Sequence, residues 1–469
     1  NQANKLHGYQ LRWRVLKQAL IGIGSGLVVG SIALTLLLFG PLSPNDQVAT
    51  VAPTSSPSVS AEVATTSPAS ESVVALEPCS VQALEEDAEI LQLQAEVRDA
   101  STGNVLFERS GNISARAASV QKLLTAAAAL QALGPNYTAV TRVYQDQADK
   151  SVLYFVGGGD VTLTRLTGQK QSVYKNAPRL EVLAASVLRK LNGQPISKIV
   201  LDSTLYGGPS GEYARDWDKR GLTEGYMSYV SALQVDGDRD NPANLSSKRS
   251  TDPVKRAGDW FKRALGSTAA TAALFKGEAP ANAVEIAQIS SRPITDWIYY
   301  MLQVSDNSLA EALARLVSLD QGFDGSPATF TNAFRSALAP TGLDLNTAKL
   351  EDGSGLSRYN QVSPKLFNDL LVLVSKNQLG LGEIRKGLPV AGSPGSLSDR
   401  FGELTGRVEA KTGWIRTGYT LSGFLKAEDD SELIFTAYNL GDSVDLDNRD
   451  ALDRLVAGFQ GCGLALANR

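Results

Sequence analysis

Residues 119–135 read SVQKLLTAAAALQALGP, a run of Ala and Leu in which Lys122 is the single charge. This composition predicts a helix over residues 119–133 that ends at Gly134-Pro135. Because apolar side chains cover most sides of the helix, we expect it to be buried in the core. Ser119 and Lys122 are three positions apart, so their side chains lie on the same side of the first turn.

A serine beside a buried lysine can act as a nucleophile. Burial disfavours the charged amine, so Lys122 can take up the hydroxyl proton of Ser119. The backbone N–H of Ser119, at the helix N-terminus, can face a developing oxyanion. The one histidine, His7, lies far upstream, which excludes histidine-based nucleophile activation in the folded part. By itself Ser-x-x-Lys also arises by chance, and a surface or capping pair is the alternative interpretation.

Two further motifs strengthen the first one. Ser305-Asp306-Asn307 precedes a predicted helix over residues 308–319, and Lys411-Thr412-Gly413 lies in a predicted strand over residues 408–415. A serine hydroxyl can relay a proton, an asparagine amide can donate to a carbonyl, and a strand lysine can neutralise a carboxylate. Gly413 leaves room for an extended peptide along an edge strand. S-x-x-K, S-D-N and K-T-G, in this order, are motifs of penicillin-binding proteins and class A β-lactamases.

The sequence resembles the D-alanyl-D-alanine carboxypeptidases/endopeptidases of the penicillin-binding protein 4 type, over about residues 90–458. Besides the three motifs, the similar stretches are GGGDVTL at 157–163, EDGSGLSRYN at 351–360, LPVAG at 388–392 and GSL at 395–397. The resemblance implies an α/β (α+β) fold with a serine β-lactamase/transpeptidase-like domain and an inserted domain. The expected boundaries are 81–139 and 256–469 for the first and 140–255 for the second.

The resemblance also implies a role for each motif. These roles are the acylated nucleophile for Ser119, its base for Lys122, a second catalytic edge for Ser305 and Asn307, and capture of the substrate carboxylate for Lys411 and Thr412. Trp414 departs from the family, which commonly has Ser or Thr after Lys-Thr-Gly. The Trp414 N–H can still complete an oxyanion hole, and its side chain either shapes the site or packs against the sheet.

We therefore expect a penicillin-sensitive serine D-Ala-D-Ala carboxypeptidase that trims peptidoglycan stem peptides, with cross-link cleavage as an open second activity. Its partners would be a stem peptide ending in D-Ala-D-Ala and β-lactam antibiotics as acylating inhibitors, without a metal or organic cofactor. The alternatives are a serine β-lactamase and a non-catalytic cell-wall scaffold. Lys and Arg total 45 against 49 Asp and Glu, a net charge of −4, so we expect no nucleic-acid partner.

Residues 19–39 carry no charge over 21 positions, enough for a helix to cross a bilayer. The basic residues that precede them are Lys5, Arg12, Arg14 and Lys17. This asymmetry predicts a single-pass signal anchor in the cell membrane, with residues 1–18 in the cytoplasm and the catalytic domain outside. A cleaved signal peptide, which would give a secreted enzyme, is the alternative. Residues 40–80 are rich in Pro, Ser and Thr, and we expect a disordered linker there.

The chain has two cysteines, Cys79 at the end of the linker and Cys462 close to the end of the chain. Two cysteines are too few for a zinc or iron–sulfur site. Disulfides persist outside the cytoplasm, so a bridge between the two ends of the globular part is the simplest interpretation. Two unpaired thiols are the alternative.

The remaining segments predict further elements. Alternation predicts a hairpin over 90–109 and strands over 137–144, 151–156, 199–202, 230–235, 419–426 and 433–439, while helical periodicity predicts helices over 179–191, 254–265, 294–302 and 448–459. Residues 236–252 are predicted to form a polar loop. We expect Asp160 and Tyr206 to be exposed to solvent, and contact with substrate is the alternative interpretation. A glycine-rich turn, which either borders the site or supports the fold, contains Asp352, Ser354 and Ser357.

Overall fold

The computed structural model describes residues 78–206 and 212–467. The predicted signal anchor at residues 19–39 and the linker up to residue 77 lie outside the described residues. Within those two ranges, no helix combines the length and the apolarity that a membrane span requires.

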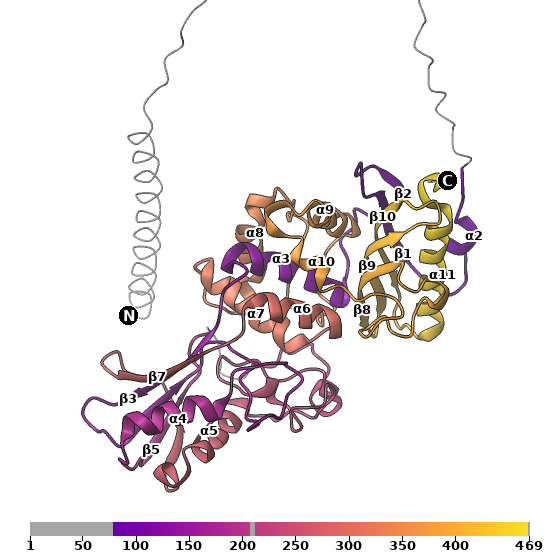
Figure 1. Ribbon diagram of the computed structural model, residues 1–469. Coiled ribbons are helices and arrows are strands. Elements are labelled where there is room, and N and C mark those ends of the chain that lie inside the picture. Colours follow the sequence, from indigo (N-terminus) through magenta and orange to yellow (C-terminus); the bar gives the residue numbers. More distant parts are fainter. Residues whose placement is uncertain (1–77, 207–211, 468–469) are drawn as a thin grey trace, which may run out of the picture. The chain divides into compact units, whose positions relative to one another are not determined.

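A five-stranded antiparallel sheet combines strands from the two end regions of the described chain, in the order β2-β1-β10-β9-β8. Its strands are β1 (Leu93–Asp99), β2 (Val105–Arg109), β8 (Val408–Ile415), β9 (Gly418–Lys426) and β10 (Glu432–Leu440). The predicted hairpin and the three predicted C-terminal strands are thus confirmed. β1 pairs with β10, with Val97 opposite Phe435, so the first strand closes against the last one (Figure 1).

Helices cover both faces of this sheet. α11 (Leu446–Cys462) and the short α2 (Gln82–Glu85) pack on one face, and α9 (Pro364–Ser375) packs on the other. Alternate residues of β10 divide between the two faces, since Phe435 belongs to the core under α11 and Ile434 to the core under α9. This sheet is therefore buried on both sides.

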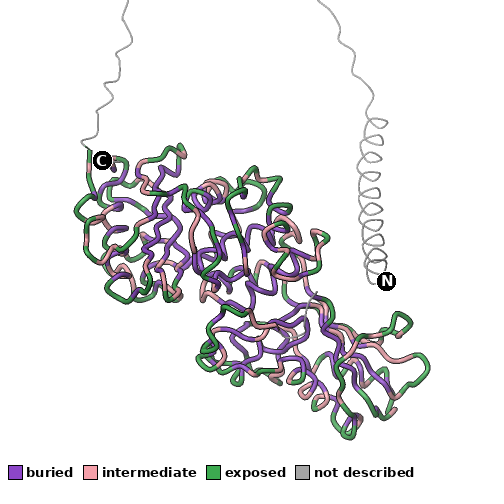
Figure 2. Tube along the Cα trace, turned by 180° about the vertical axis from the view of Figure 1, so that it is seen from behind, coloured by how far each residue is buried: buried purple, intermediate pink, exposed green. Residues whose placement is uncertain are grey.

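A helical layer continues from α9. Its members are α3 (Lys122–Leu133), α6 (Ile294–Val304), α7 (Asn307–Asp320), α8 (Phe330–Leu338) and α10 (Glu383–Lys386). α3 packs against α6, α7 and α8, and Leu123 and Ala127 on it have no exposed surface. The predicted burial of this helix is confirmed, and Figure 2 shows buried chain running from the sheet through the helical layer.

A second five-stranded sheet follows α3, in the order β6-β5-β4-β3-β7. Its strands are β3 (Val140–Gln145), β4 (Val152–Val156), β5 (Lys198–Asp202), β6 (Ala273–Lys276) and β7 (Val284–Ser290), and its helices are α4 (Leu180–Leu191) and α5 (Pro253–Ala264). Residue 255, the expected end of the insert, falls inside α5, and the strands of this sheet continue to the end of β7. No side chain of β6 or β7 is buried, and a register shift between β3 and β7 interrupts the apolar alternation of β7, so the sequence did not reveal these strands.

Residues 230–252 follow only one of the two predictions made for them. Residues 230–235 form no strand, and Val230 makes only an isolated bridge to Glu212. Residues 236–252 form the predicted polar loop, although Asp236 and Asp238 at its start have no exposed surface. Their carboxylates pair with guanidinium groups, those of Arg165 and Arg256.

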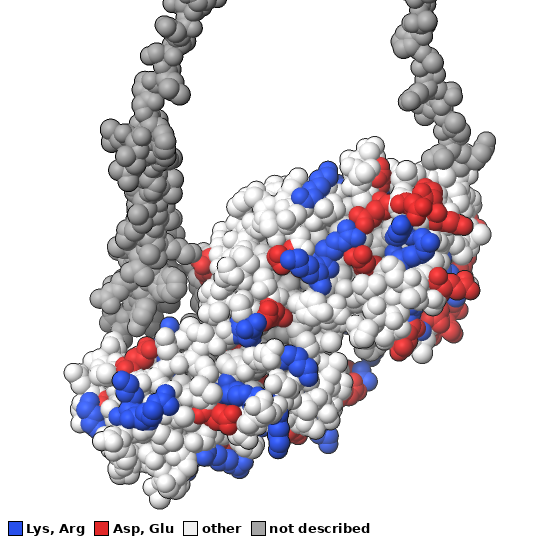
Figure 3. Space-filling view, viewed as in Figure 1, with Lys and Arg blue, Asp and Glu red and all other residues white. Residues whose placement is uncertain are grey.

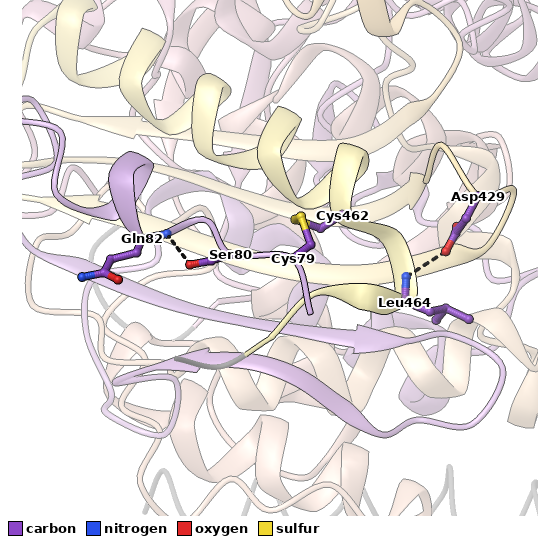
Figure 4. The surroundings of a disulfide bond; sticks show 6 residues. All are labelled: Cys79, Ser80, Gln82, Asp429, Cys462 and Leu464. Carbon is purple, nitrogen blue, oxygen red and sulfur yellow. Dashed lines mark hydrogen bonds between the residues drawn. A yellow bond between two sulfur atoms is a disulfide. The ribbon is translucent and has the colours of Figure 1, made fainter. Parts of the chain in front are cut away.

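The two cysteines form a disulfide, with their Cα atoms 5.4 Å apart. Cys79 lies just before α2 and Cys462 ends α11, as Figure 4 shows. Backbone hydrogen bonds from Cys79 N to Ala465 O and from Ala467 N to Cys79 O flank the bridge. The structure therefore joins the two ends of the domain, as the sequence analysis expects.

Charges of both signs lie over the molecular surface. In the view of Figure 3, Lys and Arg alternate with Asp and Glu, and acidic side chains are denser at the end that carries α2 and α11. This visible face has no broad basic patch of the kind that binds a phosphate backbone.

Candidate active site

Ser119 lies on a 3-10 turn, Ala118–Gln121, that leads directly into α3. Ala118 has a φ of 46°, a left-handed conformation that costs an L residue energy and is often found at functional sites. Ser119 is 9% exposed, whereas Lys122, at the first position of α3, has no exposed surface. The turn therefore keeps the hydroxyl at the edge of the core while the lysine approaches it from inside.

The Lys122 amine lies within hydrogen-bonding distance of three oxygen atoms. Its Nζ is 2.8 Å from Ser119 Oγ, 2.7 Å from Asn307 Oδ1 and 2.7 Å from the backbone oxygen of Ser354. A neutral amine has two N–H groups and one lone pair. When the two carbonyl oxygens accept the N–H groups, the lone pair faces the Ser119 hydroxyl. The geometry thus prepares Lys122 to accept the serine proton.

Burial makes Lys122 a usable base. It lowers the pKa of Lys122 from 10.5 to about 8, although the carboxylates of Asp352, Glu311 and Asp306 act in the opposite direction. At pH 7 about a tenth of the amine is then neutral, against roughly three in ten thousand at the ordinary pKa. A base is therefore available without histidine.

The Ser-Asp-Asn motif lies at the junction between α6 and α7. Ser305 ends α6 in a left-handed conformation with a φ of 58°, and Asn307 begins α7. Asp306 caps α7, because its Oδ1 accepts a hydrogen bond from Leu309 N at 2.9 Å. The turn directs Asn307 to the Lys122 amine and Ser305 to the third motif.

Strand β8 brings the Lys-Thr-Gly motif to the other side of Ser119. Lys411 has no exposed surface, and its Nζ donates to Ser305 Oγ at 3.0 Å. Burial lowers the pKa of Lys411, and the nearby Lys122 lowers it further. Gly413 lies against the serine turn, where a Cβ would come within 3.0 Å of Ser119 N. Glycine at this position allows β8 to approach the nucleophile closely.

Thr412 and Trp414 occupy different surroundings. The Thr412 hydroxyl donates to Ser396 Oγ at 2.8 Å, which ties β8 to the GSL stretch. Trp414 is 52% exposed, and its ring centre is 6.4 Å from that of Tyr419, its neighbour across the strands. Half of the indole therefore stays open to a bound molecule beside the motif.

Sequence analysis missed Glu311, a buried acid on α7. Its Oε1 accepts hydrogen bonds from Gly353 N at 2.9 Å and Ser354 N at 2.8 Å. These bonds hold the backbone of residues 353–354 in place. The backbone oxygen of Ser354 in turn accepts a hydrogen bond from the Lys122 amine. Burial raises the pKa of Glu311 to about 8. The one signal in the sequence is an acid on the predicted helix over residues 308–319, four residues after Asn307.

The glycine-rich turn both borders the site and supports the fold. Asp352 is buried, and its Oδ2 accepts from Ser357 N at 2.6 Å and from Trp217 Nε1 at 2.8 Å. Trp217 comes from the inserted segment, as does Tyr226, whose backbone oxygen accepts from Asn307 Nδ2 at 2.9 Å. The insert therefore contacts two loops of the site.

The expected exposure of Asp160 and Tyr206 is wrong. These residues are 2% and 7% exposed, respectively. Asp160 Oδ1 accepts hydrogen bonds from the backbone and hydroxyl of Thr162, and burial raises its pKa to about 6. Both side chains therefore lie inside the protein.

The arrangement supplies a nucleophile, a base and a second hydroxyl beside a second lysine. Ser119, Lys122 and Asn307 form one hydrogen-bonded group, and Ser305 and Lys411 form the other. In residues 78–206 and 212–467, no group of three or more His, Cys, Asp or Glu side chains is placed to hold a metal ion. Acyl transfer through a serine ester is the chemistry that these groups can perform.

Three comparisons relate the chain to known proteins. The family described as D-Ala-D-Ala carboxypeptidase 3 (S13) matches residues 80–243 and 238–459. The carboxypeptidase DacB of Mycolicibacterium smegmatis is 28% identical over 467 residues, 96% of this chain and 98% of the relative. A carboxypeptidase of Mycobacterium tuberculosis is 29% identical over 389 residues, 80% of this chain and 82% of the relative. Penicillin binding protein 4 of Haemophilus influenzae has a similar fold, with a TM-score of 0.66 and 21% identity over 80% of this chain and 97% of that one.

Proposed function

Because the chain belongs to the D-Ala-D-Ala carboxypeptidase 3 (S13) family, we propose that it removes the terminal D-alanine from peptidoglycan stem peptides through an acyl-enzyme on Ser119. The observation that carries this proposal is the 2.8 Å contact between Ser119 Oγ and the buried Lys122 amine. Cross-linked peptides, which contain the same kind of D-alanyl bond, are a second substrate class for the same site.

Acylation begins with a proton transfer. The neutral Lys122 amine accepts the hydroxyl proton while Ser119 Oγ bonds to the carbonyl carbon of the penultimate D-alanine. The N–H groups of Ser119 and Trp414 are assigned to the resulting oxyanion. Asn307 has two hydrogens on Nδ2, of which Tyr226 O accepts one, and the other is assigned to the substrate backbone.

Collapse of this intermediate breaks the peptide C–N bond. The departing amine of D-alanine takes the proton that Lys122 gained from Ser119, and the Ser305 hydroxyl, which accepts from Lys411 Nζ, is placed to relay it, so that Lys122 is neutral again. Lys411 and the Thr412 hydroxyl are assigned to the carboxylate of the leaving D-alanine, whose negative charge favours the ammonium form of Lys411. Water then hydrolyses the ester, with Lys122 again accepting a proton, and releases the shortened peptide.

Penicillin enters the same pathway, since opening of its amide ring acylates Ser119. A β-lactamase would clear penicillin rapidly and leave the stem peptide untouched, and a non-catalytic scaffold would react with neither. The test is to incubate the purified full chain in detergent with a stem peptide ending in D-Ala-D-Ala and, separately, with penicillin. We expect free D-alanine from the peptide and turnover of penicillin over minutes or longer. The Ser119→Ala variant is the control.

We also propose that the catalytic domain works outside the cytoplasmic membrane, held by residues 19–39 through a Pro/Ser/Thr-rich linker. The 21-residue stretch without charge and the basic residues before it support this placement. A disulfide between Cys79 and Cys462 fits an oxidising compartment. Deleting residues 1–40 should move the penicillin-labelled protein from the membrane fraction to the soluble fraction. Full-length protein found in the soluble fraction would contradict the anchor.

A further inference from the structure

Asp306 lies between Ser305 and Asn307 in the Ser-Asp-Asn motif. Residues of the inserted segment hold its side chain. Its Oδ1 caps α7, while its Oδ2 accepts from Arg239 Nη2 at 2.8 Å and from Tyr174 OH at 3.2 Å. The residue Asp306 is 5% exposed, and Arg239 is 1% exposed. The pair is thus a buried ion pair, in which loss of one partner strands a charge.

Arg239 and Tyr174 both belong to the inserted segment between β4 and β7. Arg239 Nη1 donates to the Tyr174 hydroxyl at 2.8 Å, and its guanidinium lies 4.9 Å from the centre of the tyrosine ring. The neighbouring acids of this segment are engaged elsewhere, Asp236 with Arg165 and Asp238 with Arg256. Arg239 therefore reaches across to the catalytic domain.

The backbone at this point needs such support. Ser305 has a φ of 58°, which an L residue keeps only where its surroundings fix it. The next residue, Asp306, is hydrogen-bonded both to the first turn of α7 and to the inserted segment. A shift of this residue would move the Ser305 hydroxyl from Lys411 and the Asn307 amide from Lys122.

We propose that Arg239 is a positioning residue of the reaction, which acts through Asp306 to hold Ser305 and Asn307 in place. The inserted domain is then required for acylation itself, because it supplies one half of the ion pair that fixes the catalytic edge. This inference rests on the proposed acylation of Ser119.

The test compares rate constants for acylation by a fluorescent penicillin, and kcat and KM for D-alanine release. Arg239→Met should slow acylation at least tenfold and lower kcat more than it raises KM. The reason is that Ser305 and Asn307 shift, whereas the groups assigned to the substrate carboxylate keep their positions. Arg239→Lys keeps the positive charge but cannot donate to Tyr174 and Asp306 through two separate nitrogens. Its acylation rate should therefore lie between those of the wild type and Arg239→Met. Arg256→Met is the matched control, since it breaks a pair in the same segment without touching Asp306.

The double variant Arg239→Met/Asp306→Asn separates positioning from folding. Asn is a good helix cap and carries no charge, so the double variant should acylate faster than Arg239→Met alone. Thermal unfolding of each variant shows which ones are folded. Folded Arg239→Met at the wild-type rate, or a double variant no faster than the single one, would overturn the inference. Absence of acylation in the wild-type chain would instead refute the proposed function.

Discussion

Lys122 sets the pH dependence of the reaction, because only the neutral amine can accept the Ser119 proton. Burial lowers its pKa from 10.5 to about 8, so Lys122 becomes protonated and can no longer accept a proton as the pH falls through 8. We predict that the acylation rate rises about tenfold per pH unit from pH 6 to 7 and levels off above pH 8 to 9. Penicillin acylation measured from pH 5.5 to 9.5 checks this. A rate that is constant from pH 6 to 8 would contradict the role of Lys122 as base.

The two lysines should fail in different ways. Lys122→Ala removes the base and should lower the acylation rate by about 10² to 10⁴-fold. Lys411→Ala removes a charge-assisted contact to the substrate carboxylate and should raise KM for the stem peptide roughly tenfold to a hundredfold. Steady-state kinetics of D-alanine release distinguish the two. Equal and complete losses in both variants would refute this division of roles.

At the level of single residues, the sequence predicted the site well where a motif carried the information. The three motifs indicated that Ser119, Lys122, Asn307, Ser305 and Lys411 would meet, and the structure places them together. The sequence did not reveal the support around these residues, such as the bonds from Glu311 to the 353–354 backbone or from Arg239 to Asp306. Such contacts join segments far apart in the chain, and no local pattern encodes them.

Among the structural elements, the glycine-rich turn packs directly against the turn that carries the nucleophile. Gly355 has a φ of 83°, and a Cβ there would clash with the backbone oxygen of Ala118, just before Ser119. Gly355→Ala should therefore lower the free energy of unfolding by more than the roughly 1–3 kcal/mol of a strained φ alone, and slow acylation as well.

Gly103→Ala is the matched control for this prediction. Gly103 lies in the β1–β2 hairpin with a φ of 80° and has no atom within 4 Å of an added Cβ. Alanine there should cost only about 1–2 kcal/mol and leave acylation unchanged. Urea unfolding and penicillin acylation of both variants provide the comparison. Equal effects of the two substitutions would show that the contact with Ala118 is unimportant.

The sequence predicted a strand correctly where its buried side chains leave a regular apolar pattern in the sequence. Strands β8, β9 and β10 alternate or are continuously apolar, and their predicted bounds agree with the structure to within a residue. The polar loop over residues 236–252 was predicted, but not that the carboxylates of Asp236 and Asp238 at its start pair with arginines inside the protein. These ion pairs join residues that are far apart in the sequence, so the local composition does not reveal them.

For the whole molecule, the disulfide between Cys79 and Cys462 closes a loop across 383 positions. Chain entropy makes such a bridge worth on the order of 2–5 kcal/mol. Cys462→Ser should therefore lower Tm, while penicillin acylation at 25 °C stays at the wild-type rate because the bridge lies beside α2 and α11, away from the three motifs. Two reactive thiols in the denatured, unreduced protein would rule out the bridge.

The geometry of the site, the fold and the family membership all lead to the same central claim, that Ser119 becomes acylated. The direct measurement is mass spectrometry of the intact chain and its peptides after reaction with benzylpenicillin, with Ser119→Ala and Lys122→Ala in parallel. We predict one adduct per chain, on the peptide that contains Ser119, none in Ser119→Ala and very slow labelling in Lys122→Ala. An adduct on any other serine, or labelling that persists in Ser119→Ala, would contradict the proposed mechanism.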